Sequence, residues 1–493
     1  MGPLKLAIIG GGPSSFYVAS RLLSLFPQND TLTSPLKIHI YDRLWAPHGL
    51  VRYGVAPDHP EVKNCTHKFD QVAQDPRLHF FGNIQVGPQT PPVIPHALPI
   101  SLSALKSHYT HLLFSTGCNI PTLHPTLPPS DRVIPALSLV QWYTQHPSRP
   151  PPPPLHKTEH VSVIGQGNVA LDVARMLLTP PAILEKYDVP SPVLDVLHRS
   201  AVRHVSIIGR RGLLQAAFTT KELRELTTLE GTFMTPLAPE ILAPLSPPAP
   251  SNAKLTRQQS RILQLLQKGS PGSPTATSEL PHGIKTKSWS LDFFRSPTGL
   301  TADGQYLTLA HTMLDERARA VPTGVTSLLR TDLTVTSLGH HADPSAAYFD
   351  PALGHLRTDR GRVLDTAGHT LRRVYASGWA ATGARGVLAA TMIDAYAVAD
   401  VILADHFSNG RGEVAKLESG AYSKEDALVA DDVDMVSIPK EVEEGVKAGR
   451  VVQYDQWKKI DAEELRRGAE MGKERERMGW EEAHQFLTSM GAW

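Results

Sequence analysis

Residues 6–21, LAIIGGGPSSFYVASR, decide the fold of the chain. A short apolar run breaks into three glycines, Gly10, Gly11 and Gly12, and apolar residues at helical spacing follow at once. This order predicts a strand, a tight glycine turn and a helix. Glycine lets the backbone come close to a pyrophosphate, and the free N–H groups at the start of the helix favour the phosphate charge. The stretch therefore predicts a dinucleotide site built on this turn.

The next apolar segment, Leu36–Asp42 (LKIHIYD), reads as a second strand and ends in a carboxylate. A carboxylate at this place can accept hydrogen bonds from the hydroxyls of an adenosine ribose. Ser15 stands where the glycine motif usually has a third glycine or alanine, and serine is small enough to keep the helix close to the strand. Residues 26–35 read as a loop inserted between helix and strand, which explains the long spacing between the turn and Asp42.

Length and composition limit the possible classes of protein. A chain of 493 residues predicts roughly two to four domains, and 41% hydrophobic with 20% charged residues describes an ordinary globular protein. The net charge of +1 argues against nucleic acid as a partner. The two cysteines, Cys65 and Cys118, form no Cys-x-x-Cys pair, so we expect no dithiol centre, no zinc site and no cysteine-bound iron–sulfur cluster.

Neither a membrane span nor a targeting segment is expected. No apolar run is long enough to cross a bilayer, and the first predicted strand begins almost at Met1, which leaves no room for a signal or transit segment. If the protein is imported into an organelle, this sequence lacks the presequence.

A second strand, glycine turn and helix occupy residues 160–178, with Gly165, Gly167 and Ala170 in the motif positions. Two such units in one chain predict two dinucleotides. The strand that follows ends in Arg210 and Arg211 instead of an acid. Paired guanidinium groups suit a 2′-phosphate, so this unit favours NADP over NAD. The alternative is a solvated arginine pair after a strand.

The rest of the chain completes this plan. Residues 289–297, 306–314 and 333–339 read as strands of the middle unit, and residues 374–403 return to strand, turn and helix, as in a chain that re-enters its first lobe. We predict a first lobe of residues 1–118 and 345–493, with residues 119–344 inserted as a second lobe that carries Pro/Ser-rich insertions. The charged C-terminal tail reads as helical, and its Trp457 and Trp480 are expected to pack on the body.

A small basic patch is predicted in the middle unit. Thr219 or Thr220 begins a helix that contains Arg224, and Arg257 and Arg261 stand four apart on a second helix and therefore share one face. Arg224 could join them in three dimensions. A solvated helix face is the alternative.

Several stretches resemble the adrenodoxin reductase family, the mitochondrial ferredoxin–NADP reductases of the glutathione-reductase-like flavoproteins. They are GLVRYGVAPDHPEVKN (49–64), FFGNIQVG (80–87), VIGQGNVALDVARMLLTPP (163–181), IIGRRGLLQAAFTTKELREL (207–226), FFRSP (293–297) and SGWxxxGxxGVLAATM (377–392). Related flavoproteins usually end the second flavin motif in Gly-Asp, whereas this chain has Gly378-Trp379. The resemblance implies an α/β fold of two Rossmann-like lobes, with an NADP lobe inserted in an FAD lobe.

The resemblance also implies the residues that contact each nucleotide. The matching positions for FAD are Gly10, Gly12, Ser14, Asp42, Leu50, Val86, Trp379, Gly386, Val387 and Leu388. Those for NADP(H) are Gln166, Gly167, Asn168, Val169, Arg210, Arg211, Glu222 and Gly386. Hydride would pass from NADPH to FAD, which then gives up single electrons. His59 and Asp172 match polar positions near the flavin ring, where they would move a proton or orient the amide; either could instead be structural.

The implied partner is a small acidic [2Fe–2S] ferredoxin that docks on Arg224, Arg257 and Arg261. The resemblance implies a monomeric mitochondrial enzyme that serves P450 reactions or the synthesis of haem or iron–sulfur clusters. Two departures from the family stand out, Ser15 and residues 380–385 (AATGAR), where the family usually has Lys-Arg-Gly-Pro-Thr. The alternatives are an NADPH-dependent flavoprotein subunit of the glutamate-synthase kind, which would normally carry cysteine clusters, or a nucleotide-binding scaffold without turnover.

Overall fold

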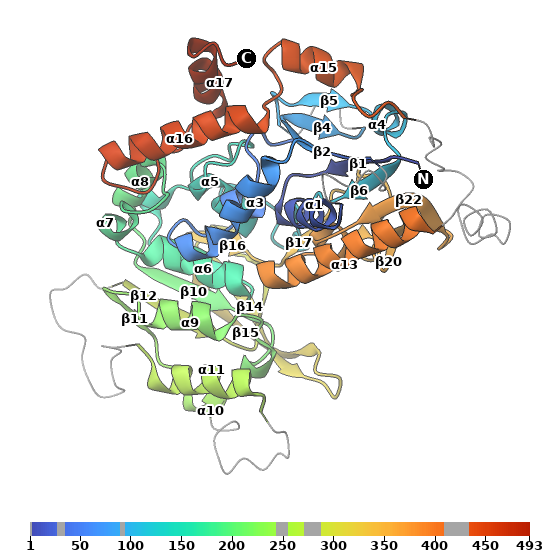
Figure 1. Ribbon diagram of the computed structural model, residues 1–493. Helices are drawn as coiled ribbons and strands as arrows, with labels where there is room; N and C mark the ends of the chain where they lie inside the picture. Colours follow the sequence, from blue (N-terminus) through green and yellow to red (C-terminus); the bar gives the residue numbers. More distant parts are fainter. Residues whose placement is uncertain (1, 27–34, 89–93, 243–254, 271–286, 409–432) are drawn as a thin grey trace.

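The computed structural model describes residues 2–26, 35–88, 94–242, 255–270, 287–408 and 433–493 (Figure 1). Its first large sheet has seven strands in the order β20-β21-β22-β6-β1-β2-β3. The central strand, β1 (Leu4–Ile9), is buried along its whole length and pairs in parallel with β2 (Leu36–Asp42) and β6 (His111–Phe114). The outer strands are β3 (Leu78–Gly82), β20 (Thr358–Asp359), β21 (Arg362–Leu364) and β22 (Thr370–Ala376). Both ends of the chain therefore contribute to one sheet.

Two long helices lie side by side on one face of this sheet. α1 (Pro13–Leu25) follows the first glycine turn, and α13 (Leu388–Phe407) follows the C-terminal one (Figure 1). α1 buries Phe16, Ala19 and Leu22, which lie three residues apart on the face turned to the core. α3 (Cys65–Ala73) packs beside α1. The predicted return of the chain to its first lobe is confirmed.

The second large sheet has six parallel strands in the order β11-β12-β10-β9-β16-β8. They are β8 (Val133–Pro135), β9 (His160–Ile164), β10 (His204–Ile208), β11 (Thr232–Met234), β12 (Lys287–Asp292) and β16 (Leu333–Thr336). The covering helices include α5 (Ala136–Tyr143), α6 (Asn168–Leu178), α9 (Thr220–Thr227) and α11 (Arg257–Lys268). α11 is the helix that was expected to carry Arg257 and Arg261. The first sheet is parallel except at its edge, where β21 pairs antiparallel with β20 and β22, and the second sheet is inserted in it. This arrangement confirms the predicted fold class.

A two-stranded ribbon stands where the chain leaves the first sheet and returns to it. β7 (Ile120–Pro121) and β17 (His340–His341) pair in antiparallel fashion there. These strands lie close to the predicted limits at residues 119 and 344. We propose that the lobe boundaries run through this ribbon.

Two regions differ from the sequence-based expectation. β13 (Arg295–Leu300), β14 (Tyr306–Leu314) and β15 (Ala320–Arg330) form a separate antiparallel sheet instead of extending the six-stranded one. β15 was not predicted, because most of its residues are exposed and it therefore lacks an apolar period. Residues 78–86, whose sequence predicts a hairpin or a strand pair, divide at Asn83 (φ of +68°) into β3 and β4 (Ile84–Val86), two strands that belong to different sheets.

The C-terminal tail folds back on the body. α16 (Tyr454–Glu470) and α17 (Trp480–Ser489) bring Trp457 into the core and Trp480 against it, as predicted. The remaining elements within the described residues are α2 (Leu50–Tyr53), α4 (Leu102–Lys106), α7 (Pro181–Leu184), α8 (Ser191–His198), α10 (Pro239–Leu242), α12 (Trp379–Thr382), α15 (Lys440–Lys447), β5 (Leu98–Ile100), β18 (Phe349–Asp350) and β19 (His355–Leu356), with short 3₁₀ helices at Pro60–Asn64, Leu155–Lys157 and Leu213–Gln215. Most of the inserted loop predicted at residues 26–35 lies outside the described residues. Among the helices that are described, none has the length and apolar character of a membrane span.

Candidate active site

The first glycine turn joins β1 to α1. Gly10 has a φ of +106°, and a Cβ added there would overlap the carbonyl of Ser115, so only glycine fits. Gly12 has no atom within 4 Å of the place where its Cβ would stand. This open space lies at the N-terminus of α1, where free N–H groups favour a phosphate. The hydroxyl of Ser14, in the first turn of α1, lies 2.9 Å from that of Ser115.

Asp42 ends β2 beside this turn. Its carboxylate accepts hydrogen bonds from the backbone N–H groups of Gly11 (2.7 Å) and Leu44 (2.9 Å). Burial raises the pKa of Asp42 to about 6, although these two hydrogen bonds act in the opposite direction. Gly10, Asp42 and Val86 line one pocket, so the structure brings together three of the positions expected to contact FAD.

The loop after β2 lies against the same turn. The backbone N–H of His48 donates to the carbonyl of Gly11 (2.8 Å), and Gly49 stands so close to Gly12 that an added Cβ would be 3.1 Å from its Cα. α2 therefore starts beside the turn, and its first residue, Leu50, is 37% exposed.

The C-terminal turn between β22 and α13 meets the first one. Gly378 has a φ of +64°, and a Cβ added there would be 2.8 Å from the hydroxyl oxygen of Ser14. Asp394 on α13 accepts the N–H of Gly378 (2.7 Å) and the hydroxyl of Ser377 (3.0 Å). Sequence reasoning missed Asp394, because nothing in its spacing shows that α13 folds back over the turn.

The other expected flavin contacts lie near this turn. The indole N–H of Trp379 donates to the carbonyl of Arg385 (3.0 Å), which closes the altered loop of residues 380–385 on itself. Gly386, Val387 and Leu388 lead into α13, and Val387 is 59% exposed. FAD needs an open glycine turn for its pyrophosphate, an acid for its ribose and a second open helix N-terminus for its ring. The first glycine turn, the buried Asp42 after β2 and the start of α13 supply these features. The residues present fit FAD.

The second glycine turn joins β9 to α6 and repeats the first. Gly165 has a φ of +130°, and an added Cβ would overlap the carbonyl of Ser337, while the space at Gly167 is open. The side chain of Gln166 packs against Gly209, and its amide nitrogen is buried with no hydrogen-bond partner within the described part of the chain. Buried donors normally have a hydrogen-bond partner, so an atom of a bound ligand is expected to accept from this one, which fits the expected NADP site.

Asn168 and Val169 open α6 at this turn. The side-chain oxygen of Asn168 accepts the backbone N–H of Thr219 (2.8 Å), so it fixes the start of α9 against the turn. This places Glu222, in the first turn of α9, close to the site.

Arg210 and Arg211 follow β10 directly after Gly209. Their carbonyls accept hydrogen bonds from the hydroxyl of Thr312 (2.7 Å) and the N–H of Phe294 (3.2 Å), which fixes the backbone while both side chains stay exposed. Burial and the charge of Arg210 lower the pKa of His124. The end of β10 is therefore a positively charged place next to the second glycine turn.

His59 and Asp172 belong to one charged cluster between the two sheets. His59 pairs with Glu225 of α9 (2.8 Å), and Arg175 of α6 pairs with Asp172 (3.1 Å) and with Asp58. Burial raises the pKa of Asp172 despite the nearby Arg175 charge. Within the described part of the chain, no hydrogen bond or ion pair joins His59 directly to Asp172. Glu225 was missed, although its place three residues after Glu222 puts both acids near one face of α9.

The predicted basic patch lies on α9 and α11, which pack together. Arg224, Arg257 and Arg261 are all exposed, and within the described residues their guanidinium groups form no ion pair. The structure thus places the three arginines on neighbouring helices. No group of metal-ligating side chains is found in the described ranges.

Comparison with known proteins adds to this geometry. The NADPH:adrenodoxin oxidoreductase of rat is 35% identical over 491 residues, which cover 96% of this chain and 89% of the rat protein. The human protein of the same name is also 35% identical, with coverage of 96% and 90%. Among solved structures, FprA of Mycobacterium tuberculosis in complex with NADPH matches with 29% identity and a TM-score of 0.78, over 98% of this chain and 99% of that chain. No family model matches the chain.

Proposed function

This chain belongs to the NADPH:adrenodoxin oxidoreductase family, and we propose that it oxidises NADPH and passes single electrons to an adrenodoxin-type [2Fe–2S] ferredoxin. It is an FAD-dependent oxidoreductase. The observation that carries the proposal is the pair of open glycine turns, one followed by the buried acid Asp42 and the other by Arg210 and Arg211.

The residues around the first and C-terminal turns would hold FAD. We assign to it Gly10, Gly12, Ser14, Asp42, Leu50, Val86, Trp379, Gly386, Val387 and Leu388. When bound, FAD supplies the conversion of a two-electron donor into one-electron transfers, which an iron–sulfur acceptor requires. The chain's own contribution is to bind and orient this group and to keep water from it.

The residues around the second turn would hold NADPH. We assign to it Gln166, Gly167, Asn168, Val169, Arg210, Arg211, Glu222 and Gly386. The orphaned amide of Gln166 favours contact with the nucleotide, and the exposed arginine pair favours the 2′-phosphate.

His59 and Asp172 lie between the lobes, where we propose that they orient the nicotinamide amide or hold a proton beside the ring. Their partners Glu225 and Arg175 restrict both side chains, which suits an orienting role.

The surface of Arg224, Arg257 and Arg261 would receive an acidic ferredoxin, because exposed arginines attract carboxylates and speed association. The rat and human members are mitochondrial by name, and this chain acts in the mitochondrion. We propose that it works as a monomer.

The proposal is tested by mixing the purified protein with NADPH without oxygen and following the flavin absorbance. Fast bleaching by NADPH and slow bleaching by NADH are expected. A colourless protein would instead support a scaffold without turnover, and equal bleaching by both nucleotides would contradict the role of Arg210 and Arg211 alone. Transfer to a [2Fe–2S] ferredoxin, followed by reduction of cytochrome c, then separates this function from that of a flavoprotein subunit with another partner.

A further inference from the structure

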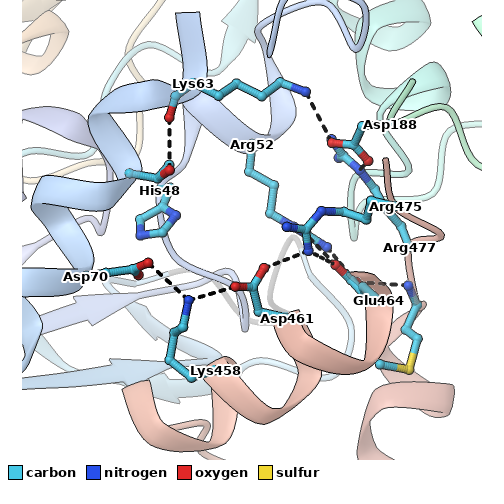
Figure 2. A network of polar contacts seen from close by, with 12 residues as sticks. His48, Arg52, Lys63, Asp70, Asp188, Lys458, Asp461, Glu464, Arg475 and Arg477 are labelled. Carbon is cyan, nitrogen blue, oxygen red and sulfur yellow. Dashed lines mark hydrogen bonds and ion pairs between the residues drawn. The ribbon is translucent and has the colours of Figure 1, made fainter. Parts of the chain in front are cut away.

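The C-terminal segment of residues 454–478, here called the clamp, lies along both lobes. It comprises α16 and the loop that leads to α17, and Figure 1 shows it beside α3 at one place and beside α8 at another. Several of its charged side chains turn inward and meet charges of the body in a buried network (Figure 2). Burying charged groups costs free energy, so solubility does not explain why the charged side chains of this segment face the body.

The first contact holds α2. Glu464 is 0% exposed. Its carboxylate accepts two hydrogen bonds from the Arg52 guanidinium, at 2.8 and 3.0 Å. It also accepts hydrogen bonds from Arg475 (2.8 Å) and from the backbone N–H of Met478 (2.9 Å). The guanidinium of Arg52 lies over the ring of Trp457, 4.7 Å from its centre. Paired parallel hydrogen bonds fix both the position and the orientation of a side chain. α2 is therefore fastened to the clamp.

The second contact holds His48, which stands two residues before α2. His48 pairs with the hydroxyl of Tyr454 (3.0 Å), which donates to Asp70 (2.6 Å). Lys458 joins Asp70 (3.0 Å) to Asp461 (2.7 Å). The backbone N–H of His48 donates to the carbonyl of Gly11 in the first glycine turn. His48 therefore connects the clamp to that turn.

The third contact holds the second lobe. Asp188, in the loop before α8, receives two hydrogen bonds from Arg477 (2.7 and 2.5 Å) and one from Lys63 (3.1 Å). Burial would raise the pKa of Asp188, but the charges of Arg477 and Lys63 outweigh it and hold the pKa well below its usual range. Arg477 is 3% exposed and also donates to the carbonyl of Thr144 (2.5 Å).

These contacts share one loop. Residues 48–64 begin at the first glycine turn, pass Arg52, reach His59 beside α9, and end near Lys63, which pairs with Asp188. The clamp thus binds the start of this loop directly, through His48 and Arg52, and Asp188 of the second lobe joins the clamp's Arg477 to Lys63 near the other end of the loop. Replacing such a network by apolar packing would often be neutral for stability, whereas a fully hydrogen-bonded network makes the relative position of its members rigid.

We propose that Arg477 and Glu464 are positioning residues that hold the NADP lobe and the loop of residues 48–64 at one spacing from the flavin turn. The inference rests on the proposed hydride transfer between two nucleotides bound in different lobes. Such a transfer is sensitive to misplacement by about 1 Å, which can reduce a rate by about 100-fold.

The main test uses Asp188→Asn, which leaves both nucleotide sites intact, and Arg466→Gln as the matched control. Arg466 pairs with Glu463 (2.8 Å) and with Glu470 on the exposed face of α16, so its loss removes two ion pairs but no lobe contact. Three quantities are measured on the FAD-bound protein: flavin content, the Kd for 2′,5′-ADP, and the rate of flavin bleaching by saturating NADPH. We expect Asp188→Asn to leave the first two within about twofold and to slow bleaching by about 10- to 100-fold, while the control matches the wild type.

An unchanged bleaching rate in Asp188→Asn would overturn the inference, and so would a parallel loss of 2′,5′-ADP affinity, which indicates local damage to the second lobe. If Asp188→Asn fails to fold, Arg477→Lys keeps the charge but loses the paired hydrogen bonds and is measured in the same way.

Spin labels at Leu25→Cys and Asp195→Cys report the lobe spacing directly. A distance distribution as narrow in the variant as in the wild type would also contradict the inference. Failure of the wild type to bleach at all would count against the proposed function and not against the clamp.

Discussion

The two glycine turns of this protein share a backbone and differ in chemistry. In each, the first glycine has a positive φ and an added Cβ would meet a carbonyl of a neighbouring strand end, while the space at the last glycine is open. The following strand ends differently: Asp42 is buried and bonded into the first turn, whereas Arg210 and Arg211 use only their backbone and extend their side chains outward. Any dinucleotide pyrophosphate suits such a backbone, so the residue after the next strand selects the ribose.

The largest effects are expected from substitutions of the first glycine of each turn, whose positive φ both turns share. Gly10→Ala and Gly165→Ala each place a Cβ on a carbonyl in a left-handed conformation, at a cost of about 2–5 kcal/mol. Gly10→Ala should lose FAD, while Gly165→Ala should keep FAD and lose binding of 2′,5′-ADP. The measurements are the ratio of flavin to protein absorbance and calorimetric titration.

Gly231→Ala is the control for this pair, because Gly231 has a φ of +70° but nothing within 4 Å of an added Cβ. It should cost only about 1 kcal/mol and affect neither nucleotide. Loss of FAD in Gly165→Ala would show that the two turns are not separate sites.

The second largest effect is expected at Arg210 and Arg211, which stand where the first lobe has Asp42. Replacing Arg210 and Arg211 together by Gln should weaken binding of NADPH by about 100-fold and leave that of NADH unchanged, because hydrogen bonds between ions contribute about 1.5–3 kcal/mol each. Stopped-flow bleaching at increasing concentrations of each nucleotide measures this. An equal loss for both nucleotides would mean that the arginines hold the pyrophosphate instead of the 2′-phosphate.

A smaller effect is expected at the acid. The pKa of Asp42 rises from 3.8 to about 6 because the group is buried, so its protonated form favours the folded state. FAD-free protein should therefore lose about 2 kcal/mol of stability as the pH rises from about 4 to about 6. Denaturant unfolding across this range should show the loss in the wild type and not in Asp42→Asn. The same pH dependence in both proteins would assign it to another group.

The smallest effect is expected outside both turns. Arg257→Glu should raise the Michaelis constant for ferredoxin several-fold, since exposed charge pairs contribute about 1 kcal/mol or less. Reduction of a small dye by NADPH should not change, and the difference in Michaelis constant should shrink as salt is added. Equal loss of ferredoxin and dye activity would contradict docking on α9 and α11.

Local patterns accounted for much of the fold and of the nucleotide sites. The apolar run, glycine triplet and helical spacing predict β1, the turn and α1, and the same signals recur at β9 and α6. The resemblance to a known family added the residues that match its motifs. β15 was missed because it is exposed and carries no period, and the separate sheet of β13, β14 and β15 was missed because strand pairing is not a local property.

Sequence by itself predicts that the chain holds two dinucleotides and favours a 2′-phosphate on the second, because both predictions depend on residues that lie within or directly after a strand, turn and helix. Only the tertiary structure decided which distant residues meet. Arg52 and Glu464 are separated by 412 positions, and Asp188 and Arg477 by 289. A buried ion pair is favourable only where folding removes water from both partners at one place, and that place does not exist until the lobes and the tail have packed together.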